Sequence, residues 1–145
     1  MGDDVARFVS VVVPLLAEEA VALHNGDAGP RKALWSHEEP VTLFGAELTR
    51  RGWDELEPSF DYLAASFTGS QSFEYEVLAA GVSGDLGYVV GIEHSVASRR
   101  GAPPVRYSLR VTTAFRREYG EWKVVHRHGD RYDEGSRTLP SVVGP

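Results

Sequence analysis

The sequence predicts one α+β domain in which three N-terminal helices pack against an antiparallel sheet. Apolar residues recur every three or four positions through most of residues 5–67, which is the period of a helix. From residue 71 onward they alternate with polar residues, which is the period of a strand. Helices and strands in separate blocks are typical of α+β folds with an antiparallel sheet, and 145 residues is an ordinary length for one domain.

The first helix is expected to begin beside Asp3 or Asp4, because either side chain can accept hydrogen bonds from the free amides of a first turn. It ends at Asn25-Gly26, since glycine adopts the left-handed conformation that terminates helices. Pro14 lies inside and is expected to kink the helix, and His24 at its end is expected to be solvated. One apolar face consists of Val5, Phe8, Val9, Val12, Leu16, Ala20 and Leu23.

Two further helices are expected before the main sheet. Residues 27–35 predict a short helix with Pro30 in its first turn, a position that proline tolerates. Residues 40–44 are interpreted as a short strand. Apolar residues at helical spacing then predict a third helix over residues 52–67, and Gly69 is expected to close it.

Four strands make up the second half of the chain. They are expected at residues 72–80, 86–97, 105–117 and 122–131. Residues 81–84 and Tyr119-Gly120 form tight turns, and residues 99–104, which are rich in glycine and proline, form a longer loop. The chain is therefore divided into a domain over residues 1–131 and a tail over residues 132–145, which is expected to be loosely ordered.

Composition argues against several classes of protein. A net charge of −6 argues against nucleic acid as the main partner, because phosphate binding needs a basic surface. The absence of cysteine excludes disulfides, thiolate chemistry and cysteine-bound zinc or iron–sulfur clusters. The first residues are acidic, unlike those of a signal peptide, and the apolar run at residues 9–16 is too short to span a bilayer. We therefore expect a cytoplasmic protein with no membrane partner.

The strand at residues 86–97 has one face of small residues. That face carries Gly87, Val89, Gly91, Glu93 and Ser95. Small side chains leave space beside a sheet, and a single carboxylate at the end of an apolar space is typical of a ligand pocket, so Val89 and Gly91 are candidate ligand contacts. The opposite face is bulkier and carries Leu86, Tyr88, Val90, Ile92 and His94.

Three stretches resemble the SnoaL-like and ketosteroid-isomerase-like families of the nuclear transport factor 2-like superfamily. They are Asn25-Gly26-Asp27, residues 84–91 (GDLGYVVG) and residues 110–130, whose centre is RREYGEWKVVHRH. The likeness extends to about residue 131 and implies a cone-shaped domain with a curved antiparallel sheet packed on three N-terminal helices. This superfamily includes isomerases, cyclases, dehydratases and binding modules, so the resemblance specifies the fold more closely than the activity.

Residues 110–130 also resemble the association domain of calcium/calmodulin-dependent kinases, and this resemblance implies which face of the sheet lines a pocket. Pocket positions of the association domain match Glu93, Thr113 and Gly129 here. They are arginines in the association domain, so the same anion site is not implied. Alternation adds further residues to this concave face, namely Val111, Phe115, Val125 and Arg127. The helices are expected to supply the walls Trp35, Trp53, Phe60 and Leu63.

Glu93 and Arg127 are expected to face one another inside the apolar cavity. One interpretation makes Glu93 a general base or a polar anchor, and the donors to a ligand oxygen would then be Tyr75, Thr113 and Arg127. The other makes Glu93 and Arg127 a structural ion pair, since such pairs perturb titration as catalytic groups do. Ketosteroid isomerases place an aspartate just after their first strand, with a tyrosine and a second aspartate, whereas only Glu47 is near that position here. That departure argues against steroid isomerisation.

The histidines of the strands allow three interpretations. His126 and His128 are predicted to share one face with Trp122 and Val124, and His94 lies on the bulky face described above. A His-x-His pair can begin a metal site, but no acidic cluster completes a set of ligands, and no metal is expected. Aromatic and apolar residues on the face opposite the helices favour a homodimer through the sheet instead. A bulge near the hairpin would move His126 and His128 into the pocket.

Two functions remain open. In the first, the protein binds a small hydrophobic carbonyl compound and moves a proton or closes a ring on it, as the resemblance to polyketide cyclases and ketosteroid isomerases implies, without metal or organic cofactor. In the second, it is a non-catalytic module that binds a ligand or dimerises. An enzyme should bury Glu93 near a donor with a route for a ligand, whereas a purely structural module should leave no room beside Glu93 and Arg127.

Overall fold

The computed structural model describes residues 2–133, so the predicted tail at residues 132–145 lies almost entirely outside the described part of the chain. The helices are α1 (Asp3–His24), α2 (Gly29–Leu34) and α3 (Trp53–Ser66). The strands are β1 (Thr42–Phe44), β2 (Thr49–Arg51), β3 (Phe67–Ser83), β4 (Leu86–Arg99), β5 (Val105–Glu118) and β6 (Glu121–Arg131). The predicted α+β class with three N-terminal helices is confirmed.

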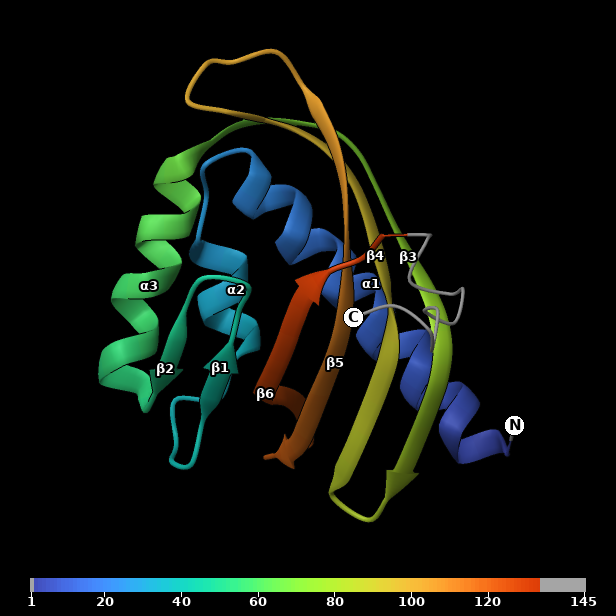
Figure 1. Ribbon diagram of the computed structural model, residues 1–145. Coiled ribbons are helices and arrows are strands. Elements are labelled where there is room, and N and C mark those ends of the chain that lie inside the picture. Colours follow the sequence, from blue (N-terminus) through green and yellow to red (C-terminus); the bar gives the residue numbers. More distant parts are fainter. Residues whose placement is uncertain (1, 134–145) are drawn as a thin grey trace, which may run out of the picture.

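The six strands form one sheet in the order β2-β1-β6-β5-β4-β3. Neighbouring strands are antiparallel except β1 and β6, which are parallel. Figure 1 shows the long strands β3, β4 and β5 bending around α1, while α3 stands beside the short strands β1 and β2. We call the side of the sheet that holds the helices the concave face and the opposite side the convex face.

α1 packs through the apolar face that its sequence predicts. Its buried side chains include Phe8, Val12, Leu16, Ala20 and Leu23. Gly2 occupies the N-cap position and no side chain caps the helix, so the prediction of Asp3 or Asp4 as the cap is wrong; both lie in the first turn, where carboxylates favour the helix dipole. The helix ends where predicted, at Asn25, and Gly26 follows with a φ of 88°. Within residues 2–133, no helix is long and apolar enough to cross a membrane.

The boundary between α3 and β3 differs from the prediction. The helix ends at Ser66 and the strand begins at Phe67, so Gly69 lies inside β3 and does not close the helix. β3 also continues through most of the segment predicted as a turn. Gly81 pairs with Tyr88 there, and a Cβ on the glycine would lie 2.5 Å from Cε1 of the tyrosine ring. The glycine therefore serves a close side-chain approach within a strand rather than a turn.

β1 and β2 form a short hairpin at one edge of the sheet. The sequence predicts β1 but not β2, which spans only Thr49–Arg51. Three polar residues carry no hydrophobic period, and for this reason pattern analysis cannot find the strand. β1 runs parallel to β6 and places Leu43 opposite Arg127. This pairing brings the hairpin to the edge of the cavity described below.

A β-bulge interrupts the ladder between β5 and β6. Phe115 pairs with Val124, but Ala114 pairs with His126, so Val125 is left without a partner across the ladder. The strict alternation assumed for β6 therefore breaks at this residue. Side chains on the two sides of the bulge follow different parities.

The bulge moves the beginning of β6 onto the concave face and leaves the histidines outside. Trp122 packs edge-on against Phe8 of α1, with ring centroids 4.8 Å apart, and Val124 is only 1% exposed. The prediction that Trp122 and Val124 share the outer face with His126 and His128 is wrong, because it assumed an unbroken strand. The bulge does not move the histidines to the concave face either, since His126 lies opposite a convex-face residue of β5.

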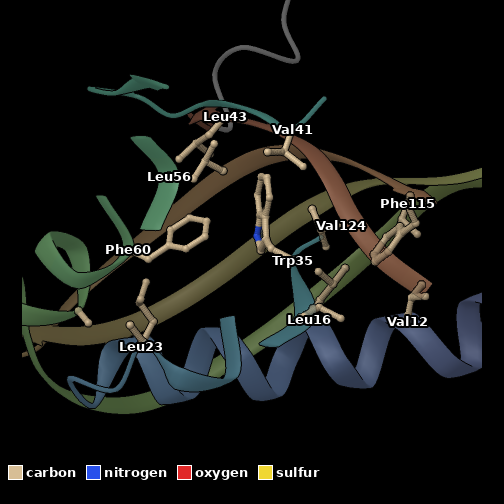
Figure 2. Close-up of a cluster of buried hydrophobic side chains, with 14 of the residues drawn as sticks. Val12, Leu16, Leu23, Trp35, Val41, Leu43, Leu56, Phe60, Phe115 and Val124 are labelled. Atoms are coloured by element: carbon tan, nitrogen blue, oxygen red, sulfur yellow. The ribbon is translucent and has the colours of Figure 1, made fainter. Parts of the chain in front are cut away.

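The hydrophobic core lies between the helices and the concave face. Figure 2 shows its buried side chains, which include Leu16, Trp35, Leu56, Phe60, Phe115 and Val124. The Trp35 and Phe60 rings are 5.2 Å apart. Burial of each large apolar side chain contributes about 1.5–3 kcal/mol. This packing fills the middle of the domain, and buried polar side chains gather beyond it, near the C-terminal end of α1.

Candidate functional site

A cavity of about 1190 Å³ lies beyond the core, at the C-terminal end of α1. It is surrounded by α3, the β1–β2 hairpin, the β4–β5 loop and the adjoining ends of β5 and β6. Its apolar lining includes Ala20, Leu23, Leu43, Leu63, Phe67 and Leu109. Its interior polar lining includes His24, Arg31, Glu93, Tyr107 and Arg127, together with the buried Ser59 and Ser66. An apolar cavity with a few convergent polar groups is typical of a small-molecule site.

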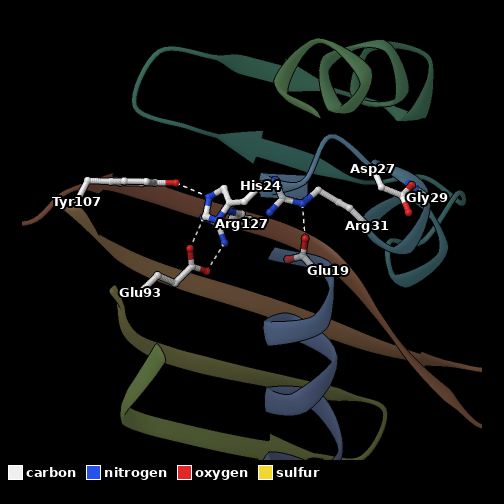
Figure 3. A network of polar contacts seen from close by, with 8 residues as sticks. All are labelled: Glu19, His24, Asp27, Gly29, Arg31, Glu93, Tyr107 and Arg127. Carbon is white, nitrogen blue, oxygen red and sulfur yellow. Dashed lines mark hydrogen bonds and ion pairs between the residues drawn. The ribbon is translucent and has the colours of Figure 1, made fainter. Parts of the chain in front are cut away.

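Glu93 of β4 and Arg127 of β6 meet at the floor of this cavity. Arg127 donates from Nη1 to Glu93 Oε2 at 2.7 Å and from Nη2 to Oε1 at 2.9 Å (Figure 3). Burial alone would raise the pKa of Glu93, but the charge of Arg127 and its hydrogen bonds outweigh burial, so the pKa is lowered and the carboxylate is ionised. Burial opposes the charge of Arg127 as well, yet Glu93 raises the pKa of that guanidinium.

A second buried ion pair lies next to the first. Arg31 of α2 donates from Nε to Glu19 Oε2 of α1 at 2.5 Å, and both side chains are almost fully buried. Arg31 also helps to lower the pKa of Glu93, and Glu19 helps to raise that of Arg127, so the two pairs act on each other. Two positive and two negative groups therefore balance in the interior, which limits the penalty of burying each one.

His24 is buried beside these pairs, so the prediction that it is solvated is wrong. It is 4% exposed, and its Nε2 lies 2.5 Å from the Tyr107 hydroxyl. Burial, reinforced by the charge of Arg31, lowers its pKa to about 4, so the ring is neutral at pH 7. Its Nδ1 has no hydrogen-bond partner among the described residues. The sequence carries a signal for this burial, because His24 follows Ala20 by four residues, the spacing of the apolar face.

Three buried hydroxyl groups lie near Glu93. Burial and the Glu93 charge raise the pKa of Tyr107, so its phenol stays protonated. Tyr75 pairs with Glu93 across the β3–β4 ladder, and burial followed by the Glu93 charge raises its pKa too. The Tyr75 and Thr113 hydroxyls influence each other but make no well-aligned hydrogen bond. Because the cavity lining includes Tyr107 but neither Tyr75 nor Thr113, Tyr107 is the hydroxyl placed to contact a ligand.

Most of the predicted wall residues belong to the core and do not border the cavity. The core residues among them are Trp35, Phe60, Val89 and Phe115. Trp53 stacks on the exposed His37, with ring centroids 3.8 Å apart, and Val125 lies at the bulge of β6. The predicted residues that do border the cavity are Leu63, Glu93, Arg127 and Gly129.

The small residues of β4 do not leave the space that the sequence suggests. A Cβ on Gly91 would lie 2.3 Å from a carbonyl oxygen of β3 and 2.5 Å from the Tyr75 ring. A Cβ on Gly87 would lie 2.7 Å from the ring of Phe8. The protein's own aromatic side chains fill this part of the concave face, and for this reason the cavity lies farther along the strands.

Part of the cavity lining that the sequence does not predict comes from the end of β4, the loop after it and β5. These residues are Arg99, Arg100, Ala102, Pro103, Val105, Tyr107 and Leu109. The Arg99-Arg100 pair looks like a solvated charge cluster in a loop, which hides its position at a cavity. Alternation does carry a signal for two others, because Tyr107 and Leu109 continue the face of Val111 and Thr113.

The strand histidines lie on the convex face, away from the cavity. His94 contacts Glu76 at 3.0 Å, and His126 contacts the Thr42 hydroxyl at 2.7 Å. His128 is exposed on the same side. Across the described part of the chain, no group of three or more histidine or acidic side chains is arranged to hold a metal ion. These histidines therefore belong to the outer surface of the sheet.

Known proteins match this chain at the level of a family and a fold. Residues 12–129 match the family model described as a SnoaL-like domain. No curated protein matches the sequence. The family match thus covers most of the chain, including every buried polar residue of the cavity.

Solved structures share the fold at low sequence identity. A nuclear transport factor 2-like superfamily protein from Salmonella enterica has a TM-score of 0.77 and 14% identity over 97% of this chain and 99% of that chain. A candidate dehydratase of the NTF2-like family from Streptomyces avermitilis has a TM-score of 0.70 and 19% identity over 88% and 98%. A ketosteroid isomerase-like protein from Erwinia carotovora atroseptica has a TM-score of 0.69 and 14% identity over 86% and 96%. Identities this low show a shared fold and assign no residue a role.

Proposed function

The chain belongs to the SnoaL-like domain family, and from this premise we propose that it binds a small hydrophobic carbonyl compound in the cavity and transfers a proton on it. The observation that carries the proposal is the meeting of Arg127, His24 and Tyr107 in one largely apolar cavity of about 1190 Å³. The proposed chemistry needs only protein side chains and uses no metal or organic cofactor.

Arg127 is proposed to hold the carbonyl oxygen. Two of its N–H groups bind Glu93, and a guanidinium has five, so donors remain for a ligand. The ligand oxygen gains negative charge when a proton leaves the neighbouring carbon, and a buried cation stabilises that charge strongly. Glu93 then acts as a positioning residue, because both of its oxygens are used to orient Arg127.

His24 is proposed to move the proton. In the tautomer with hydrogen on Nε2, that atom donates to the Tyr107 oxygen, and the buried Nδ1, which has no hydrogen-bond partner among the described residues, carries the lone pair that would accept a proton from the carbon next to the carbonyl. The Tyr107 hydroxyl hydrogen is then available to the carbonyl oxygen. Return of the proton from Nδ1 to another ligand atom completes an isomerisation. Burial and the charge of Arg31 lower the pKa of His24 to about 4, and the charge of Glu93 opposes this effect without outweighing it.

Exchange of carbon-bound hydrogen for deuterium tests this proposal. The neutral probe is methyl 4-oxo-4-phenylbutanoate in deuterium oxide, followed by proton NMR. The protein should accelerate exchange beside the ketone over buffer, and His24→Gln should abolish the acceleration, whereas His37→Gln at an exposed ring should retain it. Binding without accelerated exchange would support the ligand pocket and contradict the catalytic step. Absence of binding would overturn the proposal as a whole.

A non-catalytic ligand-binding role is the second candidate. The observation that favours it is the burial of His24 Nδ1, together with the pKa of the ring, which is lowered to about 4 and makes it a weak base. The same cavity would then hold its ligand through Arg127 and Tyr107 alone. The exchange experiment separates the two functions, because this alternative predicts binding of the ester with exchange no faster than in buffer.

The convex face supports an additional proposal, assembly of two subunits through the sheet. Leu86 is 61% exposed and Tyr88 is 45% exposed on this face. Covering such side chains with a second copy would remove apolar area from water. Light scattering of the eluted protein tests this, and Tyr88→Glu should convert a dimer to a monomer; a wild-type monomer would contradict the proposal.

A further inference from the structure

We infer that the molecule bound in the cavity carries a carboxylate or a similar anionic group, and that Arg99 and Arg131 bind this group at the cavity mouth. The inference rests on the proposed function, namely that the cavity holds a small molecule. It adds the class of ligand: a hydrophobic keto acid, with the ketone deep in the cavity and the acid at its opening.

Positive charge gathers on one side of the mouth although the chain has a net charge of −6. Arg99 and Arg100 lie where β4 passes into the β4–β5 loop, and Arg131 ends β6. All three border the cavity and are exposed, and none makes an ion pair with another described residue. Arginines without an ion-pair partner at the opening of a low-dielectric cavity attract anions and raise their local concentration.

The acidic residues of the mouth belong to other elements than these three arginines. Glu47 belongs to the β1–β2 loop, and Asp54 and Glu55 begin α3, with Arg50 between them in sequence. The interior charges contribute no net attraction, since each buried arginine has its own carboxylate. Three of the four arginines at the mouth therefore lie at the ends of β4 and β6 or in the loop between β4 and β5.

β6 supplies an arginine at each end of the open space. Arg127, Gly129 and Arg131 follow one another at alternate positions after the bulge, so they share the concave face. A Cβ on Gly129 would lie 3.6 Å from Arg127 Nη2 and 3.8 Å from Arg127 Nε, so the glycine lets the Arg127 guanidinium lie over it, along the strand toward Arg131. The two backbone positions are about 13 Å apart at the usual rise of a strand. One small molecule can therefore reach both arginines with two oxygen-bearing groups.

Arg99 is held close to the proposed proton-transfer pair. Its guanidinium lies over the Phe67 ring at 4.5 Å, and the His24 ring also lies 4.5 Å from Phe67. The same arginine acts on Tyr107, whose pKa it helps to lower against the larger effect of burial. An anion bound by Arg99 would thus lie beside His24 and Tyr107, where it orients the ligand for the chemistry proposed above.

Calorimetric titration with two matched probes tests the inference. The probes are 4-oxo-4-phenylbutanoate and its methyl ester, which differ in the anionic group alone. The acid should bind about tenfold more tightly or better, the factor expected of one charge-assisted hydrogen bond. Its affinity should fall between about 20 mM and about 500 mM sodium chloride, whereas that of the ester should not. The double variant Arg99→Gln/Arg131→Gln should bind acid and ester equally, with the ester affinity unchanged.

Arg106→Gln is the matched control, because it removes the same charge from an exposed arginine of β5 that does not border the cavity. It should keep the preference for the acid. Equal binding of acid and ester by the wild-type protein, or loss of the preference in Arg106→Gln alone, would overturn the inference and leave the proposed function standing. Binding of neither probe would overturn both.

Discussion

Arg127 and Glu93 share two hydrogen bonds, of 2.7 and 2.9 Å, across the concave face of the sheet. Their strands, β6 and β4, are separated by β5, so the two side chains bridge a whole strand. Both are buried, and a guanidinium and a carboxylate joined in this way hold each other in the charged state. This pair defines the floor of the cavity and orients the donors that the proposed function requires.

Glu93→Gln should lower the free energy of unfolding by about 3–5 kcal/mol, because it leaves the Arg127 charge buried without its partner. The double variant Glu93→Leu/Arg127→Met should cost less than Glu93→Gln, since no buried charge remains. Urea denaturation of the variants measures both effects. Losses that simply add in the double variant would contradict the coupling of the two residues.

Stability should decline between pH 6.5 and pH 4 because of His24. Its pKa is lowered from 6.5 to about 4 in the folded protein, so the unfolded chain takes up the proton first as the pH falls. Above pH 6.5 the ring is neutral in both the folded and the unfolded state, so His24 does not change the free energy of unfolding there. By pH 5 the loss should reach about 2 kcal/mol, and the full displacement of the pKa corresponds to about 3 kcal/mol.

Urea denaturation at pH 7.5 and pH 5 measures this decline. His24→Gln should remove the His24 contribution, whereas His37→Gln, at an exposed ring stacked on Trp53, should retain it. The same dependence on pH in the wild type and in His24→Gln would show that a neutral buried His24 does not contribute.

The bulge in β6 predicts unequal effects at two adjacent valines. Val124 is 1% exposed and packs in the core, so Val124→Ala should lower the free energy of unfolding by about 2 kcal/mol. Val125 is only partly buried and has no partner across the ladder, so Val125→Ala should cost less than about 1 kcal/mol. A larger loss of stability in Val125→Ala than in Val124→Ala would contradict the bulge and support the unbroken alternation that the sequence suggests.

Two glycines of the concave face should respond differently to an added side chain. Gly129→Leu adds a side chain that must share the space beside Gly129 with the Arg127 guanidinium, whose Nη2 would lie 3.6 Å from the new Cβ, so it should weaken binding of 4-oxo-4-phenylbutanoate at least about tenfold by filling the cavity. Gly91→Ala should lower the free energy of unfolding by about 3 kcal/mol or more, since its Cβ would lie 2.3 Å from a carbonyl oxygen. Thermal melting and calorimetry distinguish the two. Full binding by a folded Gly129→Leu variant would place the ligand elsewhere.

The elements of the fold were predictable from periodicity because most of them bury one face. The face of α1 that contains Phe8 and Leu16 repeats at helical spacing, and the long strands alternate. β2 was not predicted because it is short and polar. The predicted boundary between α3 and β3 was wrong because Gly69 lies inside a strand. Boundaries and short polar strands depend on neighbours that the local sequence does not contain.

The site was predictable only in part. The approach of Glu93 and Arg127 followed from the resemblance, which placed Glu93 and Gly129 on one face, and from strand parity, which places Arg127 on the face of Gly129; no bulge separates these two residues. Parity failed at Trp122 and Val124, where one unpaired residue shifts the face. The position of the cavity could not be deduced from the small residues of β4, because Phe8 and Tyr75 come from other elements to fill that space.

A titration of the ¹⁵N-labelled protein with 4-oxo-4-phenylbutanoate, read at the arginine Nε–Hε signals, tests the central claim most directly. The account predicts that the Arg127 signal shifts together with those of Arg99 and Arg131, while the signal of Arg106 outside the cavity stays in place. Shifts confined to Arg106 and the convex face, or no shift at millimolar probe, would contradict a small-molecule site at Arg127.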